Sequence, residues 1–157
     1  MIDCKESALR LLSFKDRTEE EMRRKLKEKS YTENEVEDVI AFLKEYGYIN
    51  DRRYAERFSS DAKKIKKWGR RRIEAELLSR GIPREIIDEV TKENEEDEKE
   101  IILDEIKRRF KNADFSNRKE RARIFSYFAR RGFSTEKIYG AINLVCSFED
   151  IETNYVD

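Results

Sequence analysis

Residues 124–134 read IFSYFARRGFS, and residues 73–83, which lie 51 positions earlier, read IEAELLSRGIP. A third stretch, residues 22–32, reads MRRKLKEKSYT at the same offset. Each stretch has two large apolar residues four positions apart, then a small residue, an apolar residue, and Thr, Pro or Ser. A constant offset across several matched columns indicates an internal repeat, and this repeat decides the fold.

The matched columns have a physical meaning that is clearest in the last copy. Ile124 and Phe128 are four residues apart and therefore lie on one face of a helix. Gly132 follows that face at the position where a left-handed C-cap residue is preferred. Ser134 then suits the N-cap of a new helix. Each stretch predicts the end of one helix and the start of the next, with Gly81 and Gly132 at positive φ.

Apolar stripes predict the helices on both sides of this turn. The stripes expected after the turn are Val36, Val39, Ile40 and Leu43; Ile86, Ile87 and Val90; and Ile138, Ala141, Ile142 and Val145. The stripes expected in a helix before each pair are Cys4, Ala8, Leu11 and Leu12; Tyr54, Ala55, Phe58, Ala62 and Ile65; and Ile101, Ile102, Ile106, Phe110 and Ala113. Each unit should therefore contain three helices around a small core.

We expect an all-α fold of three tandem three-helix repeats that form a short curved solenoid. The predicted repeats are residues 1–49, 50–93 and 94–148, followed by a C-terminal tail at 149–157. Units of about 50 residues bury little surface alone, so neighbours should support one another.

Polar residues mark the two expected joints between repeats, near residues 47–51 and 94–97. Asn50 or Asp51 is expected to cap the helix that follows the first joint. The acidic run 93–100 should be the solvated start of a helix, because its carboxylates fan around the helix and do not converge on a metal ion.

The composition argues for a helical protein without catalytic equipment. Hydrophobic residues make up 38% and charged residues 45%, with five Gly, one Pro and no His. The chain has no His, which is the commonest general base, and it has no Gly-rich phosphate-binding loop.

Cys4 and Cys146 are isolated in the sequence, which predicts buried free thiols in a reducing compartment. No apolar run approaches a membrane span. We expect a cytoplasmic protein that is not an enzyme and needs no cofactor or metal.

The zero net charge conceals alternating blocks along the chain. Residues 1–50 carry −2, residues 51–92 carry +5, residues 93–107 carry −6, residues 108–137 carry +7 and residues 138–157 carry −4. Screening in physiological salt acts over roughly 8 Å, so a close partner meets each block separately. The two basic zones are therefore the candidate contact regions.

Several motifs, taken in order, resemble the RecX family of recombination regulators. They are Ala8-Leu9 with Leu11-Leu12, Glu21-Met22 and Lys25-Leu26; Gly47-Tyr48-Ile49-Asn50-Asp51 with Arg53-Tyr54-Ala55; Trp68-Gly69 with Arg72-Ile73 and Arg80-Gly81-Ile82; and Arg130-Arg131-Gly132-Phe133-Ser134. The likeness covers roughly residues 5–145.

The resemblance implies a bacterial protein that binds the RecA recombinase. Such proteins lie in the helical groove of the RecA–single-stranded-DNA filament and bridge neighbouring protomers. They restrain its ATP hydrolysis, its strand exchange in homologous recombination and DNA repair, and its stimulation of repressor self-cleavage in the SOS response. Some relatives are markedly basic, whereas this chain has equal numbers of acidic and basic residues, which favours recombinase binding over stand-alone DNA binding.

Two basic clusters are the candidate partner-binding or nucleic-acid-binding residues. The first contains Lys63, Lys64, Lys66, Lys67, Trp68, Arg70, Arg71 and Arg72; the second contains Arg108, Arg109, Arg118, Arg121, Arg130 and Arg131. A solvated helix end is the plain alternative for such runs. Basic residues around an exposed Trp suit phosphate contact with base stacking, and they also suit an acidic protein groove. Together the clusters are expected to form one basic ridge, and Phe125 is expected to face outwards.

A tandem DNA-binding module is the rival function, because three-helix units can place their last helix in the major groove. That function requires basic final helices, whereas the helix after Thr32 carries Glu33, Glu35, Glu37 and Asp38 and the helix after Pro83 carries Arg84, Glu85, Asp88 and Glu89. We therefore expect a monomer that binds a RecA filament, with single-stranded DNA as a possible second contact within that complex and no membrane association.

Overall fold

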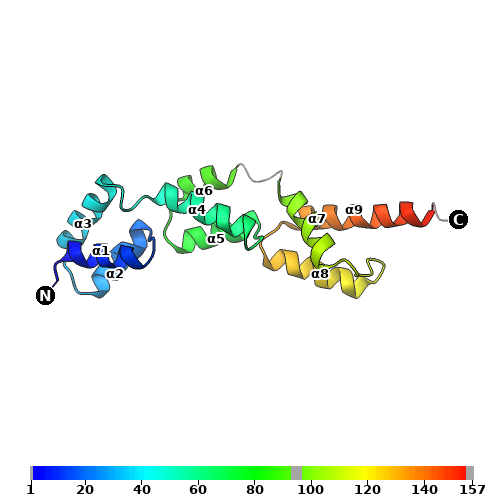
Figure 1. Cartoon of the computed structure of the whole chain (residues 1–157), viewed down its shortest axis with the longest axis horizontal. Coiled ribbons are helices and arrows are strands. Elements are labelled where there is room, and N and C mark those ends of the chain that lie inside the picture. The colour runs from blue at the N-terminus through cyan, green and yellow to red at the C-terminus, as the bar shows by residue number, and fades with distance from the viewer. Residues whose placement is uncertain (1, 93–96, 155–157) are drawn as a thin grey trace. The chain divides into compact units, whose positions relative to one another are not determined.

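The computed structural model describes the backbone of residues 2–92 and 97–154. Within those residues the chain forms nine α-helices and no strand (Figure 1). The helices are α1 (Cys4–Phe14), α2 (Glu19–Glu28), α3 (Glu33–Glu45), α4 (Asp51–Lys64), α5 (Arg70–Ser79), α6 (Arg84–Thr91), α7 (Asp97–Arg109), α8 (Arg118–Arg130) and α9 (Thr135–Asn154). None of these helices is both long enough and apolar enough to cross a membrane. The predicted all-helical class is confirmed.

The helix starts follow the capping residues expected from the sequence. The Thr32 hydroxyl accepts from the Glu35 amide at 3.3 Å, and the Glu35 carboxylate accepts from the Thr32 amide at 2.8 Å, which completes a capping box at α3. Ser134 accepts from the Lys137 amide at 3.3 Å at the start of α9. Asn50, one of two predicted caps, accepts from the Arg53 amide at 3.0 Å at α4.

The first three helices enclose one apolar core. α1, α2 and α3 all pack against one another. Met22 and Leu26 of α2 are fully buried, as are Val36 and Leu43 of α3, so the predicted stripes on these two helices are confirmed. Burying side chains of this size contributes about 1.5–3 kcal/mol each to folding.

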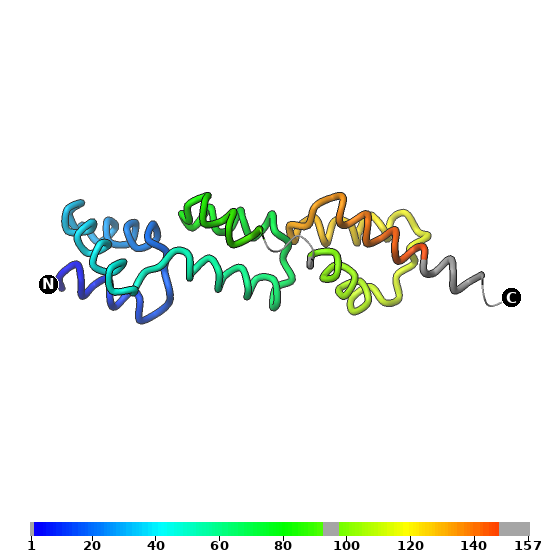
Figure 2. The backbone as a smooth tube through the Cα atoms, turned by 90° about the horizontal axis from the view of Figure 1, so that it is seen from above, coloured from blue at the N-terminus to red at the C-terminus, as the bar shows by residue number. Residues whose placement is uncertain are grey.

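The last three helices enclose a second core, in which α9 packs along both α7 and α8 (Figure 2). Ile124 and Phe128 of α8 are fully buried against Ile138 of α9 and Ile102 of α7. The Phe128 ring meets the Phe133 ring edge-to-face with centroids 5.8 Å apart. Since edge-to-face ring pairs have a preferred geometry, this aromatic core fixes the angle at which α9 leaves the turn.

The turn after the second helix of each domain has the predicted left-handed residue. Gly81 has φ +80° and Gly132 has φ +92°, so this prediction is confirmed. Ser30 occupies the same repeat column with φ +69°, a conformation that costs a residue with a Cβ more than it costs glycine.

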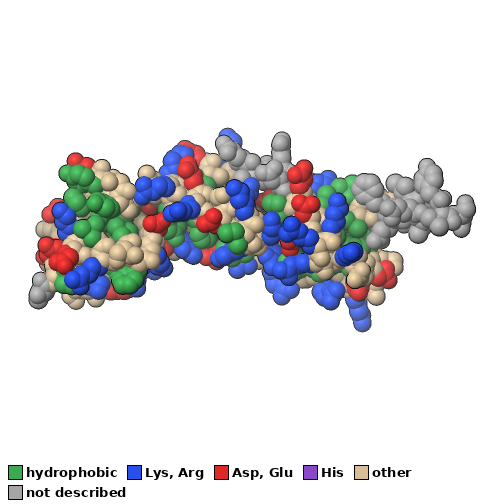
Figure 3. Space-filling view, in the orientation of Figure 1, with side chains coloured by type: hydrophobic (Ala, Val, Ile, Leu, Met, Phe, Trp, Pro, Cys, Tyr) green, Lys and Arg blue, Asp and Glu red, His purple; other side chains and the backbone are tan. Residues whose placement is uncertain are grey.

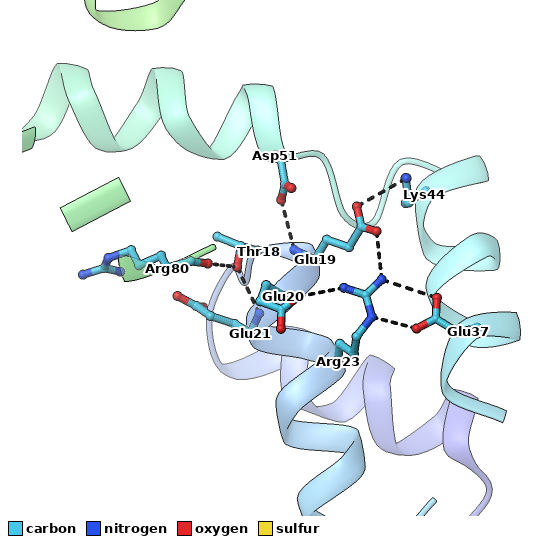
Figure 4. Close-up of polar contacts among 9 residues, drawn as sticks. All are labelled: Thr18, Glu19, Glu20, Glu21, Arg23, Glu37, Lys44, Asp51 and Arg80. Atoms are coloured by element: carbon cyan, nitrogen blue, oxygen red, sulfur yellow. Dashed lines mark hydrogen bonds and ion pairs between the residues drawn. The ribbon is translucent and has the colours of Figure 1, made fainter. Parts of the chain in front are cut away.

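The described contacts divide the chain into two compact units, one made of residues 1–61 and 75–90 and the other of residues 62–74 and 91–157. In the first unit, the N-terminus of α2 meets the turn between α5 and α6 (Figure 4). The Thr18 hydroxyl donates to the Arg80 carbonyl at 2.6 Å, and the Glu19 amide donates to the Asp51 carboxylate at 3.0 Å.

An ion-pair network surrounds this contact in the first unit (Figure 4). Arg23 of α2 pairs with Glu37 of α3 at 2.7 Å and with Glu20 at 2.8 Å, while Lys44 pairs with Glu19 at 3.3 Å. The hydrogen bond to Glu37, together with those to Glu19 and Glu20, raises the pKa of Arg23. Burial raises the pKa of the Asp51 carboxyl group, and the bond from Glu19 opposes that effect.

The second unit contains an equivalent contact one repeat later. The Gly69 amide donates to the Arg131 carbonyl at 2.7 Å, and the Arg71 amide donates to the Gly132 carbonyl at 3.1 Å. Gly69 and Arg131 stand exactly one repeat length after Thr18 and Arg80. A Cβ atom on Gly69 would lie 2.6 Å from the Gly132 carbonyl carbon, so only glycine allows the two backbones to approach this closely.

Some expectations require correction. Ile65, predicted to be buried, is 75% exposed because α4 ends at Lys64 and the chain turns away, with the Trp68 amide donating to the Ala62 carbonyl at 3.1 Å. Cys4 is buried, as expected, whereas Cys146 is only half-buried. The joint predicted at residues 94–97 lies outside the described residues except for Asp97, where α7 begins.

Replacing Gly132 with alanine should lower the free energy of unfolding by at least about 2 kcal/mol, because a Cβ there both resists positive φ and meets Arg72. Gly47 is the matched control, since its φ is +73° but nothing lies within 4 Å of its Cβ position. Gly47→Ala should therefore cost only about 1 kcal/mol. Equal losses for the two variants, measured by denaturant unfolding, would contradict the backbone contact.

Candidate partner-binding surface

The first basic cluster spans the end of one helix and the beginning of the next. Lys63 and Lys64 end α4, and Arg70, Arg71 and Arg72 begin α5. The connecting residues include Lys67 with φ +55°, a left-handed residue that reverses the chain. The whole cluster therefore lies around one tight connection within the second compact unit.

Trp68 lies between two cations of the same cluster. The Lys66 ammonium is 4.5 Å from the ring centroid of Trp68, and the Arg72 guanidinium is 4.0 Å from it. The ring is half-buried, not fully exposed as expected from the sequence. Cation–π contacts of this kind are worth about 0.5–1 kcal/mol each near a surface. Trp68 therefore holds the positive charges of Lys66 and Arg72 beside each other.

The glycine contact brings two residues of the second predicted cluster, Arg130 and Arg131, beside the first cluster. The Arg131 guanidinium donates to the Lys66 carbonyl, and the Arg72 guanidinium donates to the Arg130 carbonyl at 3.4 Å. We use the name basic surface for Lys63, Lys64, Lys66, Lys67, Arg71, Arg72, Arg108, Arg109, Arg130 and Arg131. In Figure 3, Lys and Arg side chains gather over α7 and α8.

A buried carboxylate, that of Glu98, holds the start of α5 in place. Glu98 of α7 is only 2% exposed, although its segment was expected to be solvated. One of its oxygens accepts from the Arg70 amide at 2.7 Å, and the other pairs with Lys137 of α9 at 3.1 Å. Glu98 thus ties the start of α5 to α9. This role could not be predicted from the sequence, because Glu98 lies in a run of similar carboxylates.

The Arg70 side chain is half-buried and already paired within the second unit. Its Nε donates to the Glu74 carboxylate at 2.6 Å, and the same oxygen accepts from the Thr91 hydroxyl at 3.2 Å. Because this guanidinium already has a carboxylate partner, Arg70 is less suited to contact a partner than Arg71, which is exposed.

Arg109 and Arg131 share one aromatic ring. The Arg131 guanidinium lies 4.4 Å from the Tyr127 ring centroid and that of Arg109 lies 5.6 Å from it. The Tyr127 hydroxyl donates to Glu105 at 3.0 Å, and Glu105 also pairs with Arg109 at 3.3 Å. Burial, followed by the bond to Glu105, raises the pKa of Tyr127, so the phenol remains a donor at neutral pH. Tyr127 therefore connects the end of α7 to the turn.

Three further predicted arginines are exposed: Arg108, which belongs to the basic surface, and Arg118 and Arg121, which do not. Arg108 ends α7, and Arg118 and Arg121 lie on α8. Arg118 and Arg121 border a cleft of about 420 Å³ between α8 and α9, lined also by Phe125 and Tyr139. Phe125 was expected to face outwards; it is half-buried and lines this cleft. Tyr139 was not predicted as a site residue. It occupies the repeat column that holds Glu37 in the first repeat and Asp88 in the second.

The arrangement offers cations beside aromatic faces, which suits the binding of an anionic surface. Among the residues that the structure describes, no three His, Cys, Asp or Glu side chains converge as a metal site would require.

Family models match most of the chain. Residues 4–43 match the first three-helix domain of RecX, residues 50–90 match the second and residues 95–142 match the third.

Three relatives share the name "Regulatory protein RecX". The protein of Clostridium beijerinckii is 37% identical over 137 residues, which cover 85% of this chain and 63% of that protein. The protein of Caldanaerobacter subterraneus subsp. tengcongensis is 36% identical, with 90% of this chain and 70% of that protein covered. The protein of Trichlorobacter lovleyi is 34% identical, with 87% and 91% covered.

Two solved structures are similar in fold. The crystal structure of RecX from Lactobacillus salivarius superposes with a TM-score of 0.77 at 23% identity and covers 89% of this chain and 92% of that chain. A second crystal structure, of regulatory protein RecX, has a TM-score of 0.73 at 26% identity, with coverage of 89% and 70%.

Replacing Glu98 with alanine should lower the free energy of unfolding by about 2–3 kcal/mol, because the Arg70 amide and the Lys137 ammonium both lose a buried partner. Glu100→Ala is the control, since Glu100 lies exposed on the same helix and should change the free energy by less than about 0.5 kcal/mol. If thermal or denaturant unfolding gives both variants the same stability, Glu98 does not anchor α5.

Proposed function

Because the chain belongs to the RecX family, we propose that it is a negative regulator of the RecA recombinase. It binds in the groove of the RecA–single-stranded-DNA filament and modulates three activities of that filament: ATP hydrolysis, strand exchange and stimulation of repressor self-cleavage. It acts as a binding protein without catalysis of its own.

The observation that supports the proposal is the junction at Gly132, which brings Arg130 and Arg131 beside Lys66 and Arg72 although these pairs are far apart in the sequence. A filament groove presents repeated protein surfaces and a phosphate backbone. Cations held on a rigid turn, such as Arg72 beside Trp68, lose less side-chain entropy on binding than free ones do. Several modest contacts that form together give firm binding.

The acidic final helices favour this function over direct reading of duplex DNA. Glu33, Glu35 and Glu37 are exposed on α3, and Asp88 and Glu89 are exposed on α6. Carboxylates on the helix that would enter the major groove repel phosphate.

The test measures ATP hydrolysis by RecA filaments on single-stranded DNA as this chain is titrated in. The variant reverses Lys64, Arg71 and Arg108 to Glu together; these side chains are exposed and have no ion pair with a residue that the structure describes. The expected result is that the parent chain inhibits hydrolysis and the triple variant does so at least about tenfold less effectively, since each lost contact is worth about 0.5 kcal/mol or more.

The matched control reverses Lys25, Lys27 and Lys29 of the first domain, which changes the net charge by the same amount. This control should inhibit almost as well as the parent, because those residues lie in the unit that lacks the basic surface. Circular dichroism and thermal unfolding of both variants establish that they are folded. Equal inhibition by the two variants would contradict the proposed role of the basic surface, and no inhibition by the parent would contradict the function.

A further inference from the structure

The cleft between α8 and α9 is separate from the glycine junction. Its volume is about 420 Å³, within the range of sites that hold small organic groups. It is lined by Arg118, Arg121, Ala122, Phe125, Ser126, Tyr139, Ile142 and Asn143, none of which is acidic. The lining therefore combines two positive charges, two aromatic rings and polar side chains that can form hydrogen bonds.

Comparison of the repeats shows that the third domain has replaced an ion pair with an aromatic pair. Phe125 and Tyr139 stand two repeat lengths after Arg23 and Glu37. In the first domain, Arg23 and Glu37 join α2 to α3 through an ion pair of 2.7 Å. In the third domain, the two rings stack with centroids 4.9 Å apart and planes at 26°. The stack joins α8 to α9, but that role alone does not require an open cleft beside it.

The tyrosine of this pair has an accessible aromatic surface. Tyr139 is 52% exposed, whereas Phe125 is half-buried beneath it. An exposed ring that is held in place by a second ring is a rigid platform, so a planar group can stack on it at little cost in conformational entropy.

The two arginines of the cleft are available for an anion. Arg118 and Arg121 are three residues apart on α8, so their side chains project from the same side of the helix. Both are exposed, and neither has an ion pair with a carboxylate in the described part of the chain. Guanidinium groups pair with phosphate through two parallel hydrogen bonds.

We propose that this cleft binds one nucleotide of a single-stranded nucleic acid. The base stacks on Tyr139, its edge meets the Asn143 amide, and the adjoining phosphate pairs with Arg118 and Arg121. A nucleotide uses all three features at once, whereas an acidic peptide uses the arginines and leaves the aromatic platform unexplained. The site does not depend on the proposed function, because it can bind a free strand without any recombinase.

The test measures binding of the full chain to a labelled oligothymidylate of about a dozen nucleotides by fluorescence anisotropy, without recombinase. Tyr139→Ala should weaken binding by about tenfold, since stacking on one aromatic ring contributes that much per base. Tyr139→Phe should bind like the parent because it keeps the ring. Tyr46→Ala is the matched control, since Tyr46 is 65% exposed and also packs on a phenylalanine, Phe42, with centroids 4.7 Å apart.

A salt series and an abasic strand separate the phosphate contact from the base contact. Arg121→Gln should reduce the slope of log affinity against log salt by about 0.7, whereas Tyr139→Ala should leave the slope unchanged. An abasic strand of the same length should bind the parent and Tyr139→Ala equally. The proposal is overturned if Tyr139→Ala and Tyr46→Ala bind equally well, or if Tyr139→Phe loses binding as fully as Tyr139→Ala.

The same variants distinguish this site from the proposed function. Tyr139→Ala retains every residue of the basic surface, so it should still inhibit filament ATP hydrolysis if the proposed function is correct. Failure of strand binding with intact inhibition rejects the nucleotide site alone, whereas strand binding without inhibition supports this site and rejects the proposed function.

Discussion

Close approach of two backbones at a glycine is the constraint on which the second compact unit depends. The Gly69 amide reaches the Arg131 carbonyl at 2.7 Å, and a Cβ on Gly132 would lie 2.5 Å from the Cβ of Arg72. The first unit has the equivalent contact one repeat earlier, but there a side chain forms it: the Thr18 hydroxyl donates to the Arg80 carbonyl at 2.6 Å. In each unit, the start of one domain's second helix is thus tied to the turn of the following domain.

Aromatic rings and a buried carboxylate lie among the positive charges of the second unit. Lys66 and Arg72 flank the Trp68 ring, Arg131 lies over Tyr127, and a buried Glu98 accepts from the Arg70 amide. Aromatic faces and backbone carbonyls offset part of the charge while leaving the cations accessible at the surface. The local structure therefore supplies a positive surface, and this is the surface that we propose contacts the filament.

The repeat made much of the fold predictable, because periodic apolar residues and a left-handed glycine are local signals. The stripes of α2 and α3 and the positive φ of Gly81 and Gly132 followed from spacing alone. Ile65 was wrongly predicted to be buried, because the position of a helix end depends on where the next helix packs. Glu98 and Tyr139 were missed because one resembles its neighbours in an acidic run and the other becomes informative only when its column is compared across the repeats.

Site-specific photo-crosslinking tests the central claim most directly. A photoreactive residue placed at Arg71, within the basic surface, is mixed with RecA filaments on single-stranded DNA, and a second version carries it at Lys27 of the first domain. The account predicts crosslinks from position 71 to the recombinase that require the assembled filament and exceed those from position 27. Equal crosslinking from both positions, or crosslinks from position 71 to free duplex DNA alone, would contradict it.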